Sequence, residues 1–466
     1  MYVMIFDALH KEKLLQGVMV FLLCILLICG CSKEPETVNT GNISQAAEDT
    51  PDIGDDGSRD GESGTEMSEK GEQEIPSPSP EVETWDRPKV KGIFVTGAMA
   101  GTDNMENLID LVDQTELNAM VIDVKNDEGR VTFDMDVPSV REMGVCIRYI
   151  RDIQDLMEKC KEKNIYLIAR IVAFKDPYME QVKPEWCIHN ADGSLFKDKN
   201  GMTWLDPHNE QVWAYLLDVA QGALDIGFDE IQFDYMRFST DPNMESVDFG
   251  QQDEDRRKVI TEFVKYASER IHAVGGAVSA DVYGVVIDSD GDQRIVGQDY
   301  LELSRYLDYI SPMVYPSHYG PYNYNIPVPD AEPYRLVLTA LQSSRKVLAG
   351  VPVNEKKENP GSESGMSGNT ISGNTVPEHD QVKEEEIPET EYSTEELASL
   401  EPLEGVRVRV RPWLQAFTAT WVKGHILYEG DEIRAQIQAV YDAGYEEWIL
   451  WNASNKYTDE GLMKEE

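Results

Sequence analysis

The chain has 466 residues, of which 41% are apolar, and a formal net charge of −44 at pH 7. This length allows one large domain with additional segments, and the modest apolar fraction suggests that part of the chain lies outside a packed core. A chain this acidic repels phosphate backbones, so nucleic acid is excluded as an expected partner. Residues 33–86 and 354–404 carry much of the acidic charge.

The N-terminus has the plan of a secretory signal. Lys11 and Lys13 precede an apolar run from Leu14 to Gly30, which is a charged region followed by a hydrophobic one. The end of this run, Leu-Ile-Cys-Gly followed by Cys31, resembles the lipobox of bacterial lipoprotein signal peptides. The resemblance implies cleavage before Cys31 and a diacylglycerol on its sulfur. The alternative is an uncleaved single span, and both place the rest of the chain at the cell membrane, facing outside the cytoplasm.

Two further segments have compositions that are typical of disorder. Residues 31–86, which follow the signal peptide at 1–30, are rich in Ser, Gly, Glu, Asp and Pro, and they predict a disordered acidic tether. Residues 354–402 have a similar composition and predict a disordered acidic insertion. The remaining cysteines, Cys146, Cys160 and Cys187, are odd in number and lack metal-type spacing, so we expect free thiols.

Between residues 87 and 455, apolar strands alternate with amphipathic helices, and residues 456–466 form a tail. The expected strands are 91–96, 119–124, 165–174, the first half of 230–238, 277–283, 309–315, 406–417 and 447–452, with 348–353 as a further start of a strand. The expected helices are 103–116, 146–163, 208–226, 253–273, 299–307, 334–346 and 431–443. Asp103 is the expected N-cap of the first helix, and Gly227 is expected to end the third.

Eight strands joined by helices predict an α/β protein with a (β/α)8 TIM barrel fold, and the insertion then precedes the seventh strand. A doubly wound open sheet is the alternative. Gly97-Ala-Met-Ala-Gly101 follows the first strand but lacks the spacing of a dinucleotide-binding loop, which favours the barrel.

In such a barrel the active site lies at the carboxyl ends of the strands. The polar and aromatic residues expected there are Asp123, Lys125, Asp127, Arg170, Asp234, Arg237, Asp281, Tyr283, Tyr315, His318, Trp413, Gln415, Trp451 and Asn452. Paired carboxylates are the equipment of glycoside hydrolysis, and aromatic faces pack against sugar rings. The sequence has no G-x-S-x-G motif, no metal-type cluster and no catalytic Cys/His pattern, so no metal or other cofactor is expected.

Several motifs carry a resemblance to a known family. They are Lys91-Gly-Ile-Phe-Val-Thr, Val121-Ile-Asp-Val-Lys-Asn-Asp, Ile168-Ala-Arg-Ile-Val-Ala-Phe, Trp204-Leu-Asp-Pro, Glu230-Ile-Gln-Phe-Asp-Tyr-Met-Arg-Phe, Ser279-Ala-Asp-Val-Tyr-Gly, Ser311-Pro-Met-Val-Tyr-Pro-Ser-His-Tyr and Arg411-Pro-Trp-Leu-Gln. Over residues 87–455 the chain resembles the family described as the Putative glycosyl hydrolase domain, found in bacterial proteins. The resemblance implies a TIM barrel distantly similar to the α-amylase-type hydrolases, and a glycosidase. The acidic insertion departs from the family pattern.

The leading hypothesis is hydrolysis of a polysaccharide by Asp234 and Asp281. Asp234 is the expected nucleophile, held ionised by Arg170 or Arg237, and Asp281 is the expected acid/base from the adjacent strand. Asp123, with Lys125 and Asp127, is an alternative second carboxylate or a substrate clamp, and the other strand-end residues are expected to bind substrate.

Two other functions remain open. One is a carbohydrate-binding lipoprotein of the cell envelope without turnover. The other is metal-assisted hydrolysis or deacetylation by Asp234, Asp281 and His318. In all three cases we expect a monomer that meets a polysaccharide or oligosaccharide and is attached to the membrane through Cys31.

Overall fold

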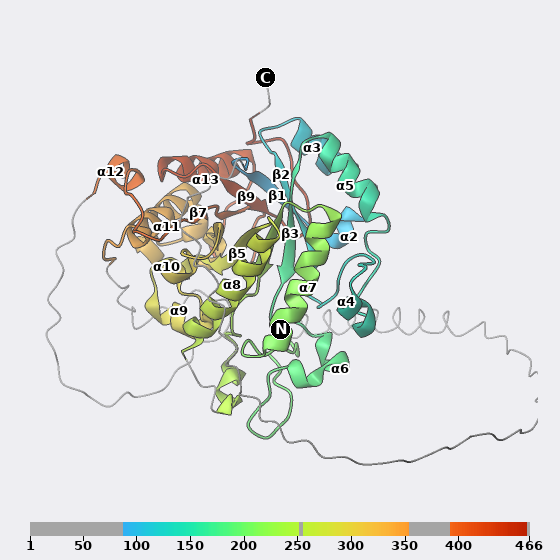
Figure 1. Ribbon diagram of the computed structural model, residues 1–466. Coiled ribbons are helices and arrows are strands. Elements are labelled where there is room, and N and C mark those ends of the chain that lie inside the picture. The colour runs from blue at the N-terminus through green and yellow to red at the C-terminus, as the bar shows by residue number, and fades with distance from the viewer. Residues whose placement is uncertain (1–86, 251–254, 354–391, 464–466) are drawn as a thin grey trace, which may run out of the picture. The chain divides into compact units, whose positions relative to one another are not determined.

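The computed structural model describes residues 87–250, 255–353 and 392–463. Within these ranges a barrel of parallel strands is surrounded by helices (Figure 1). The strands are β1 (Lys91–Val95), β2 (Ala119–Lys125), β3 (Tyr166–Val172), β4 (Glu230–Asp234), β5 (Ala277–Tyr283), β6 (Tyr309–Met313), β7 (Arg409–Val410), β8 (Trp413–Gln415) and β9 (Trp448–Trp451). The sheet closes because β9 pairs with β1 and β5 pairs with β6, so the predicted barrel is confirmed.

The seventh strand of the barrel is broken into two pieces. Strand β7 pairs with the start of β6, and β8 pairs with the end of β6 and with β9. Pro412 lies between the two pieces and has no N–H to donate to a ladder. The single strand expected over 406–417 is therefore two short strands that together fill one place in an eight-stranded barrel.

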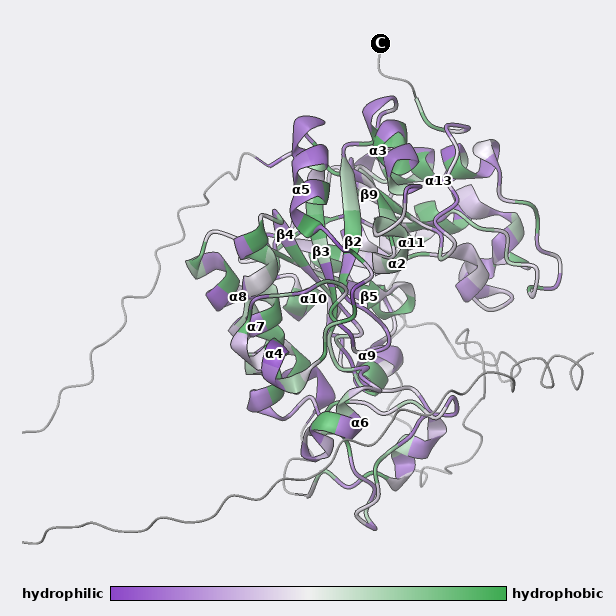
Figure 2. Cartoon of the chain, turned by 90° about the vertical axis from the view of Figure 1, so that its right-hand side faces the viewer, coloured by the Kyte–Doolittle hydropathy of each residue, from purple (hydrophilic) through white to green (hydrophobic). Residues whose placement is uncertain are grey.

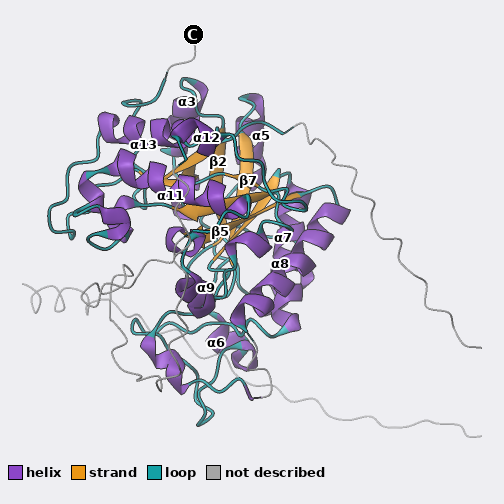
Figure 3. Ribbon diagram, turned by 90° about the vertical axis from the view of Figure 1, so that its left-hand side faces the viewer, coloured by secondary structure: helices purple, strands orange, loops and turns teal. Residues whose placement is uncertain are grey.

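Most of the α-helices form a layer outside the strands (Figure 3). They are α2 (Gly97–Ala100), α3 (Met105–Asp113), α4 (Pro138–Met143), α5 (Ile153–Glu162), α6 (Met179–Val182), α7 (Glu210–Ile226), α8 (Arg256–Ala273), α9 (Asp290–Val296), α10 (Tyr300–Leu303), α11 (Pro333–Leu348), α12 (Thr394–Ala398) and α13 (Gly430–Asp442). Hydrophobic colour gathers on the strands and on the helix faces toward them, while hydrophilic colour dominates the outer faces (Figure 2).

Local signals explain most helix ends. The side chain of Asn209 accepts a hydrogen bond from the Gln211 N–H at the start of α7, and Gly227 ends this helix with a φ of 114°. The predicted stop at Gly227 is thus confirmed. The predicted cap at Asp103 is wrong, because the residue before α3 is Asn104 and its side chain makes no capping hydrogen bond.

Two other expected elements differ from the structure. The helix expected over 146–163 begins only at Ile153, because Asp152 caps it and Val131 forms a bridge with Cys146. No strand forms over 348–353, since Leu348 is the last residue of α11.

The expected disorder is tested only in part. Residues 1–86 and 354–391 lie outside the described residues. The signal peptide, the tether and most of the insertion therefore stay predictions. Residues 392–402, assigned to the insertion, instead contain α12. Its Ser393 and Glu396 form a capping box, and Leu397 is buried. The expected disorder was wrong here, because one buried leucine and a good cap suffice for a single packed turn.

Successive side chains of a strand point to opposite faces of the sheet, so the core has one part inside the barrel and another between strands and helices. In β4, Phe233 points outward and meets Phe263 of α8, with 5.3 Å between ring centroids. Glu230 points inward, where it accepts hydrogen bonds from Arg411, Ser279 and Tyr166. The inside of the barrel is therefore filled with polar and aromatic side chains at this level, and the aliphatic core lies between strands and helices.

Long loops extend the molecule beyond the carboxyl ends of β3 and β4. The loop after β3 carries α6, and it is bridged to the loop after β4 by pairing of Asn190 with Val247 and by the Ala191 N–H donating to the Ser246 carbonyl. Both loops lie on one side of the strands in Figures 1 and 3. Within the described ranges, no helix is long and apolar enough to cross a bilayer.

Candidate active site

The carboxyl ends of four neighbouring strands gather a cluster of charged side chains. Asp123 of β2 is paired in register with Arg170 of β3. Phe233 of β4 is paired with Ala280 of β5, so the next residues, Asp234 and Asp281, reach the same level on adjacent strands. We call Asp123, Arg170, Asp234 and Asp281 the carboxylate cluster. These four side chains lie where a barrel places its chemistry.

Arg170 holds the cluster together. Its Nη1 lies 2.5 Å from Asp123 Oδ1, and its Nη2 and Nε lie 2.5 Å and 3.0 Å from Asp234 Oδ2. Both terminal nitrogens also reach Asp127 Oδ2 at 3.5 Å. Burial lowers the pKa of Arg170, but the neighbouring carboxylates, Asp234 first, outweigh this effect and raise the pKa well above its usual value. A planar guanidinium can bridge several carboxylates in this way, which an ammonium cannot.

Asp234 is surrounded by donors. Besides the two Arg170 contacts, its Oδ1 accepts a hydrogen bond of 2.6 Å from the backbone N–H of Tyr235. Tyr235 has a φ of 49°, a left-handed conformation that is unfavourable for a tyrosine. This unfavourable backbone conformation lies directly beside the Asp234 carboxylate, at the end of β4. Three N–H groups therefore donate to the Asp234 carboxylate and hold it in one position.

Arg237 does not hold Asp234, contrary to one of the two expectations. Its Nη1 donates to the carbonyl of Phe238, and its guanidinium lies over the rings of Trp204 and Tyr283, at 4.9 Å and 4.6 Å from their centroids. Arg170 is thus the cation beside Asp234, and Arg237 packs among aromatic rings next to it. Tyr283, another expected substrate-binding residue, lies half-buried under this guanidinium.

Asp281 has the opposite environment to Asp234. It is 2% exposed, and its Oδ1 accepts a 2.6 Å hydrogen bond from the indole N–H of Trp413. Burial, and then the charge of Asp234, raise the pKa of Asp281 well above its usual value. The two neighbouring carboxyls thus have different surroundings, since Asp234 accepts from three N–H groups and Asp281 accepts from a buried indole.

Asp123 and Asp127 also differ from each other, in pKa and in exposure. Burial raises the pKa of Asp123 to about 6, in spite of its contact with Arg170. Burial would also raise the pKa of Asp127, but Arg170 and Lys175 outweigh it and lower that pKa. The Asp127 side chain is 44% exposed, while that of Asp123 is 6% exposed. Asp127 is therefore the charged carboxylate at the rim of the cluster.

Aromatic rings line the mouth beside the cluster. Phe94 lies under the Arg170 guanidinium at 5.4 Å and meets Trp413 and Trp451 at 6.3 Å and 6.4 Å between ring centroids. Trp413 is 2% exposed, so it positions Asp281 and offers no open platform for a sugar. Trp451 is half-buried and also contacts Tyr315, at 5.6 Å.

Three residues expected to bind substrate have structural partners instead. Lys125 is fully buried, with its Nζ 2.8 Å from Asp176 Oδ2 and 2.8 Å from the Val172 carbonyl. Gln415 is fully buried and bonds to Asp330 and to the backbone of neighbouring loops. Asn452 donates to the carbonyls of two adjacent segments. These contacts argue against direct binding of substrate, and we reassign all three residues to supporting the loops.

His318 lies on the rim, apart from the carboxylates. It is exposed, its Nδ1 is 3.0 Å from Ser317 Oγ, and its ring meets Tyr315 at 5.2 Å. Among the described residues, no group of three or more His, Cys, Asp and Glu side chains is arranged to hold a metal ion. The expected free thiols are confirmed for Cys146, Cys160 and Cys187.

Sequence reasoning missed several residues of the mouth. Lys175 and Tyr235 each lie just beyond a strand end, and Lys175 Nζ lies 4.5 Å from the Tyr235 ring centroid and 3.4 Å from Asp127 Oδ1. Phe94 lies inside an expected strand and is apolar, so its sequence position does not mark it as a residue of the mouth. Phe417 and Trp421 come from the loop after β8, where the sequence pattern does not distinguish an exposed ring from a buried one.

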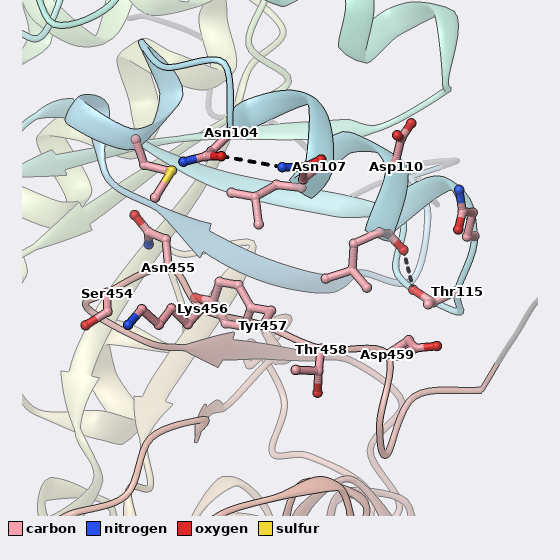
Figure 4. Close-up of a pocket in the computed structure, with 14 residues that line it drawn as sticks. Asn104, Asn107, Asp110, Thr115, Ser454, Asn455, Lys456, Tyr457, Thr458 and Asp459 are labelled. Atoms are coloured by element: carbon pink, nitrogen blue, oxygen red, sulfur yellow. Dashed lines mark hydrogen bonds between the residues drawn. The ribbon is translucent and has the colours of Figure 1, made fainter.

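A surface groove lies away from this cluster (Figure 4). It has a volume of about 760 Å³ and runs between α3 and the segment after β9. Its lining is mostly amide, hydroxyl and charged side chains, among them Asn104, Asn107, Asp110, Lys456 and Asp459. None of the carboxylate cluster lines it, so the groove is distinct from the candidate active site.

A family model agrees with this architecture. The model described as the Putative glycosyl hydrolase domain matches residues 92–360 and 378–457. The chain belongs to the Putative glycosyl hydrolase domain family. The break in the family match at 361–377 falls within the expected acidic insertion, which is where the chain was expected to depart from the family. No curated protein matches the chain.

Three solved structures of bacterial proteins are among those that match the chain. A hypothetical protein from Ruminiclostridium thermocellum is 37% identical, covering 41% of this chain and 97% of its own, with a TM-score of 0.38. The PgaB (BpsB) glycoside hydrolase domain from Bordetella bronchiseptica is 10% identical, covering 80% and 95%, with a TM-score of 0.48. The spore cortex-lytic enzyme SleL from Bacillus megaterium is 11% identical, covering 82% and 73%, with a TM-score of 0.41.

Proposed function

We propose that this member of the Putative glycosyl hydrolase domain family hydrolyses glycosidic bonds of a polysaccharide outside the cytoplasmic membrane. Family membership gives the reaction class. The observation that carries the assignment of residues is the contrast between two carboxyls on adjacent strands. Three N–H groups donate to Asp234 and hold its carboxylate in one position, whereas Asp281 is buried and burial raises its pKa. A glycosidase needs a fixed nucleophile and an acid, and we assign these roles to Asp234 and Asp281.

In the proposed reaction, Asp281 donates its proton to the glycosidic oxygen as the bond from that oxygen to the anomeric carbon breaks. Asp234 acts on the anomeric carbon from the other side, as the nucleophile, and its charge stabilises the oxocarbenium-like transition state. Water then attacks the same carbon, the bond from that carbon to Asp234 breaks, and Asp281 takes a proton from the water. A separation of the carboxyls near 5–5.5 Å gives retention, and one near 6.5–9.5 Å, with Asp234 activating water directly, gives inversion.

Arg170 has a positioning role in this proposal. It fixes the Asp234 carboxylate and adjoins Asp123, which is a candidate for an alternative second carboxylate. Asp127, Arg237, Tyr283, Tyr315, His318 and Trp451 are proposed as the parts of the mouth that meet substrate.

We further propose that the chain is a monomeric lipoprotein attached to the cell membrane through diacylglycerol on Cys31. The lipobox-like end of the N-terminal apolar run supports this placement. An enzyme held there meets envelope or extracellular glycans, so these glycans are the substrates to be examined first.

The test is incubation of the purified chain with a panel of bacterial exopolysaccharides, wall glycans and α-glucans, with released sugars read by mass spectrometry. The wild type is expected to release sugars from a member of the panel, and Asp234→Asn and Asp281→Asn are each expected to abolish release while circular dichroism stays unchanged. Asp225→Asn, at an exposed position of α7, is the matched control and should retain full activity. Glycan binding by the wild type without any release would favour the carbohydrate-binding alternative.

A further inference from the structure

A continuous series of aromatic rings leads from the carboxylate cluster to the surface. Phe94 lies under the Arg170 guanidinium and stacks with Trp451, with 6.4 Å between ring centroids. Trp451 meets Phe417 at 5.3 Å, and Phe417 stacks with Trp421 at 5.9 Å. The series therefore connects the residue that holds Asp234 to the outside of the barrel mouth.

Trp421, at the end of this series, is unusually open for a tryptophan. Its relative exposure is 64%, whereas tryptophan is highly buried on average. Its indole lies nearly parallel to the Phe417 ring, with 17° between the planes. Phe417 therefore covers one face and fixes the plane of the indole, and the opposite face is available to a ligand.

The loop that carries these two rings is anchored on both sides. The Tyr428 N–H donates to Thr418 Oγ1 at 3.0 Å, and the Tyr428 hydroxyl donates to the Asp330 carbonyl at 3.0 Å. At its base, Gln415 donates to Asp330 and accepts from the Ser317 N–H. A ring held in place before binding loses little conformational entropy when a ligand stacks on it.

We propose that Phe417 and Trp421 form a platform that binds a sugar ring of the substrate at a distance from the bond that is cut. The C–H faces of a sugar ring pack on an aromatic face, and the continuity of the rings with the carboxylate cluster favours substrate as the occupant. The proposal rests on the proposed function and deepens it. The substrate is a polymer or long oligosaccharide, and a small glycoside does not reach the platform.

The test measures binding of the full-length protein to malto-, cello- and chito-oligosaccharide ladders and to wall-glycan fragments of increasing length on an array. For the ladder that binds, affinity is expected to rise about tenfold once an oligomer is long enough to reach Trp421, which is about 1.4 kcal/mol. Trp421→Ala should lose this rise while it binds the short members as the wild type does. Trp421→Phe keeps a ring and should retain most of the rise.

Leu427→Ala is the matched control, because Leu427 lies on the same loop and has the same exposure of 64%. It should bind like the wild type, since it removes exposed apolar surface without removing a ring. Equal affinities of Trp421→Ala and the wild type at all lengths overturn the platform, and so does the absence of length-dependent binding by the wild type to every ladder and fragment.

Turnover of the same oligomers separates this proposal from the proposed function. Length-dependent binding through Trp421 without turnover supports the platform and contradicts hydrolysis. Turnover of long oligomers with unchanged binding and kinetics in Trp421→Ala supports hydrolysis and contradicts the platform.

Discussion

At the scale of single residues, Arg170 links the proposed nucleophile Asp234 to two neighbouring carboxyls. It touches Asp123, Asp127 and Asp234 with one planar group. Arg170→Lys keeps the positive charge but cannot reproduce these contacts, so the Asp234 carboxylate loses its fixed position. We expect kcat to fall about a hundredfold, the effect of a small misplacement of a reacting group.

A largely retained thermal midpoint would show that the loss in Arg170→Lys comes from positioning. Lys159→Arg, an exchange at an exposed ion pair of α5, is the control and should leave both activity and midpoint unchanged. Wild-type kcat in Arg170→Lys would show that the fixed position of Asp234 is not needed.

Asp123 makes stability depend on pH. Burial raises its pKa from the usual 3.8 to about 6 in the folded chain, so the folded state binds the proton more tightly than the unfolded state does. The resulting stabilisation is fully present below pH 3.8 and is lost as pH rises through 6. Relative to Asp123→Asn, which does not titrate, the wild type should lose about 2 kcal/mol between pH 4 and pH 7.

Urea unfolding of both proteins at the two pH values measures this difference. The Asp110→Asn variant, at an exposed position of α3, serves as the control and should show the same pH dependence as the wild type. A pH-independent difference between wild type and Asp123→Asn would mean that Asp123 is charged throughout this range.

At the scale of secondary-structure elements, the broken seventh strand depends on a buried ion pair. Arg411, between β7 and β8, pairs with Glu230 at the start of β4, and both side chains are fully buried. Arg411→Met leaves the Glu230 charge inside the barrel without its cation. We expect a loss of about 3–5 kcal/mol in the free energy of unfolding, measured by denaturant titration.

The exposed pair of Lys89 and Glu446 offers a matched comparison, because its side chains are 58% and 63% exposed. Lys89→Met should cost less than about 1 kcal/mol. Equal losses in the two variants would contradict a special role of the buried pair.

The strands and their carboxyl ends were predictable, because buried apolar runs and the polar residues after them have a clear pattern. That pattern brought Asp123, Arg170, Asp234 and Asp281 to one edge. It failed for Lys125, because the register between β2 and β3 shifts between Asp123 and Lys125. A bulge of this kind redirects a side chain, and the local sequence does not predict where the bulge occurs.

Side-chain partners that are distant in sequence were not predictable either. The contact of Trp413 with Asp281 joins residues 132 positions apart. The pattern of apolar residues predicts only that each of them lies near a strand end. The exposure of Trp421 depends on how the loop after β8 folds back on Phe417. The sequence therefore predicted which polar residues lie at the strand ends. Only the structure showed which residues are buried and support their neighbours, and which are exposed.

At the scale of the whole molecule, the proposed lipid on Cys31 is what would hold this acidic chain at a membrane. Cys31→Ser is expected to lose labelling by radioactive palmitate in a bacterial host, because the lipidated sulfur is gone. Cys29→Ser, two positions earlier, should keep the label. Persistent labelling of Cys31→Ser, or no labelling of the wild type, would contradict the lipoprotein assignment.

Asp234 and Asp281 are proposed to take different roles in the hydrolysis of one glycosidic bond. The most direct measurement compares their Asn variants on the polysaccharide that the wild type cuts and on an aryl glycoside of the same sugar with an acidic phenol as leaving group. Such a phenol departs without protonation, so Asp281→Asn should keep its kcat/KM for the aryl glycoside near the wild-type value, while its kcat/KM for the polysaccharide falls about 10²–10⁴-fold. Asp234→Asn should lose both reactions. Polysaccharide cleavage at the wild-type rate in either variant, or aryl glycoside cleavage by Asp234→Asn, would contradict the account.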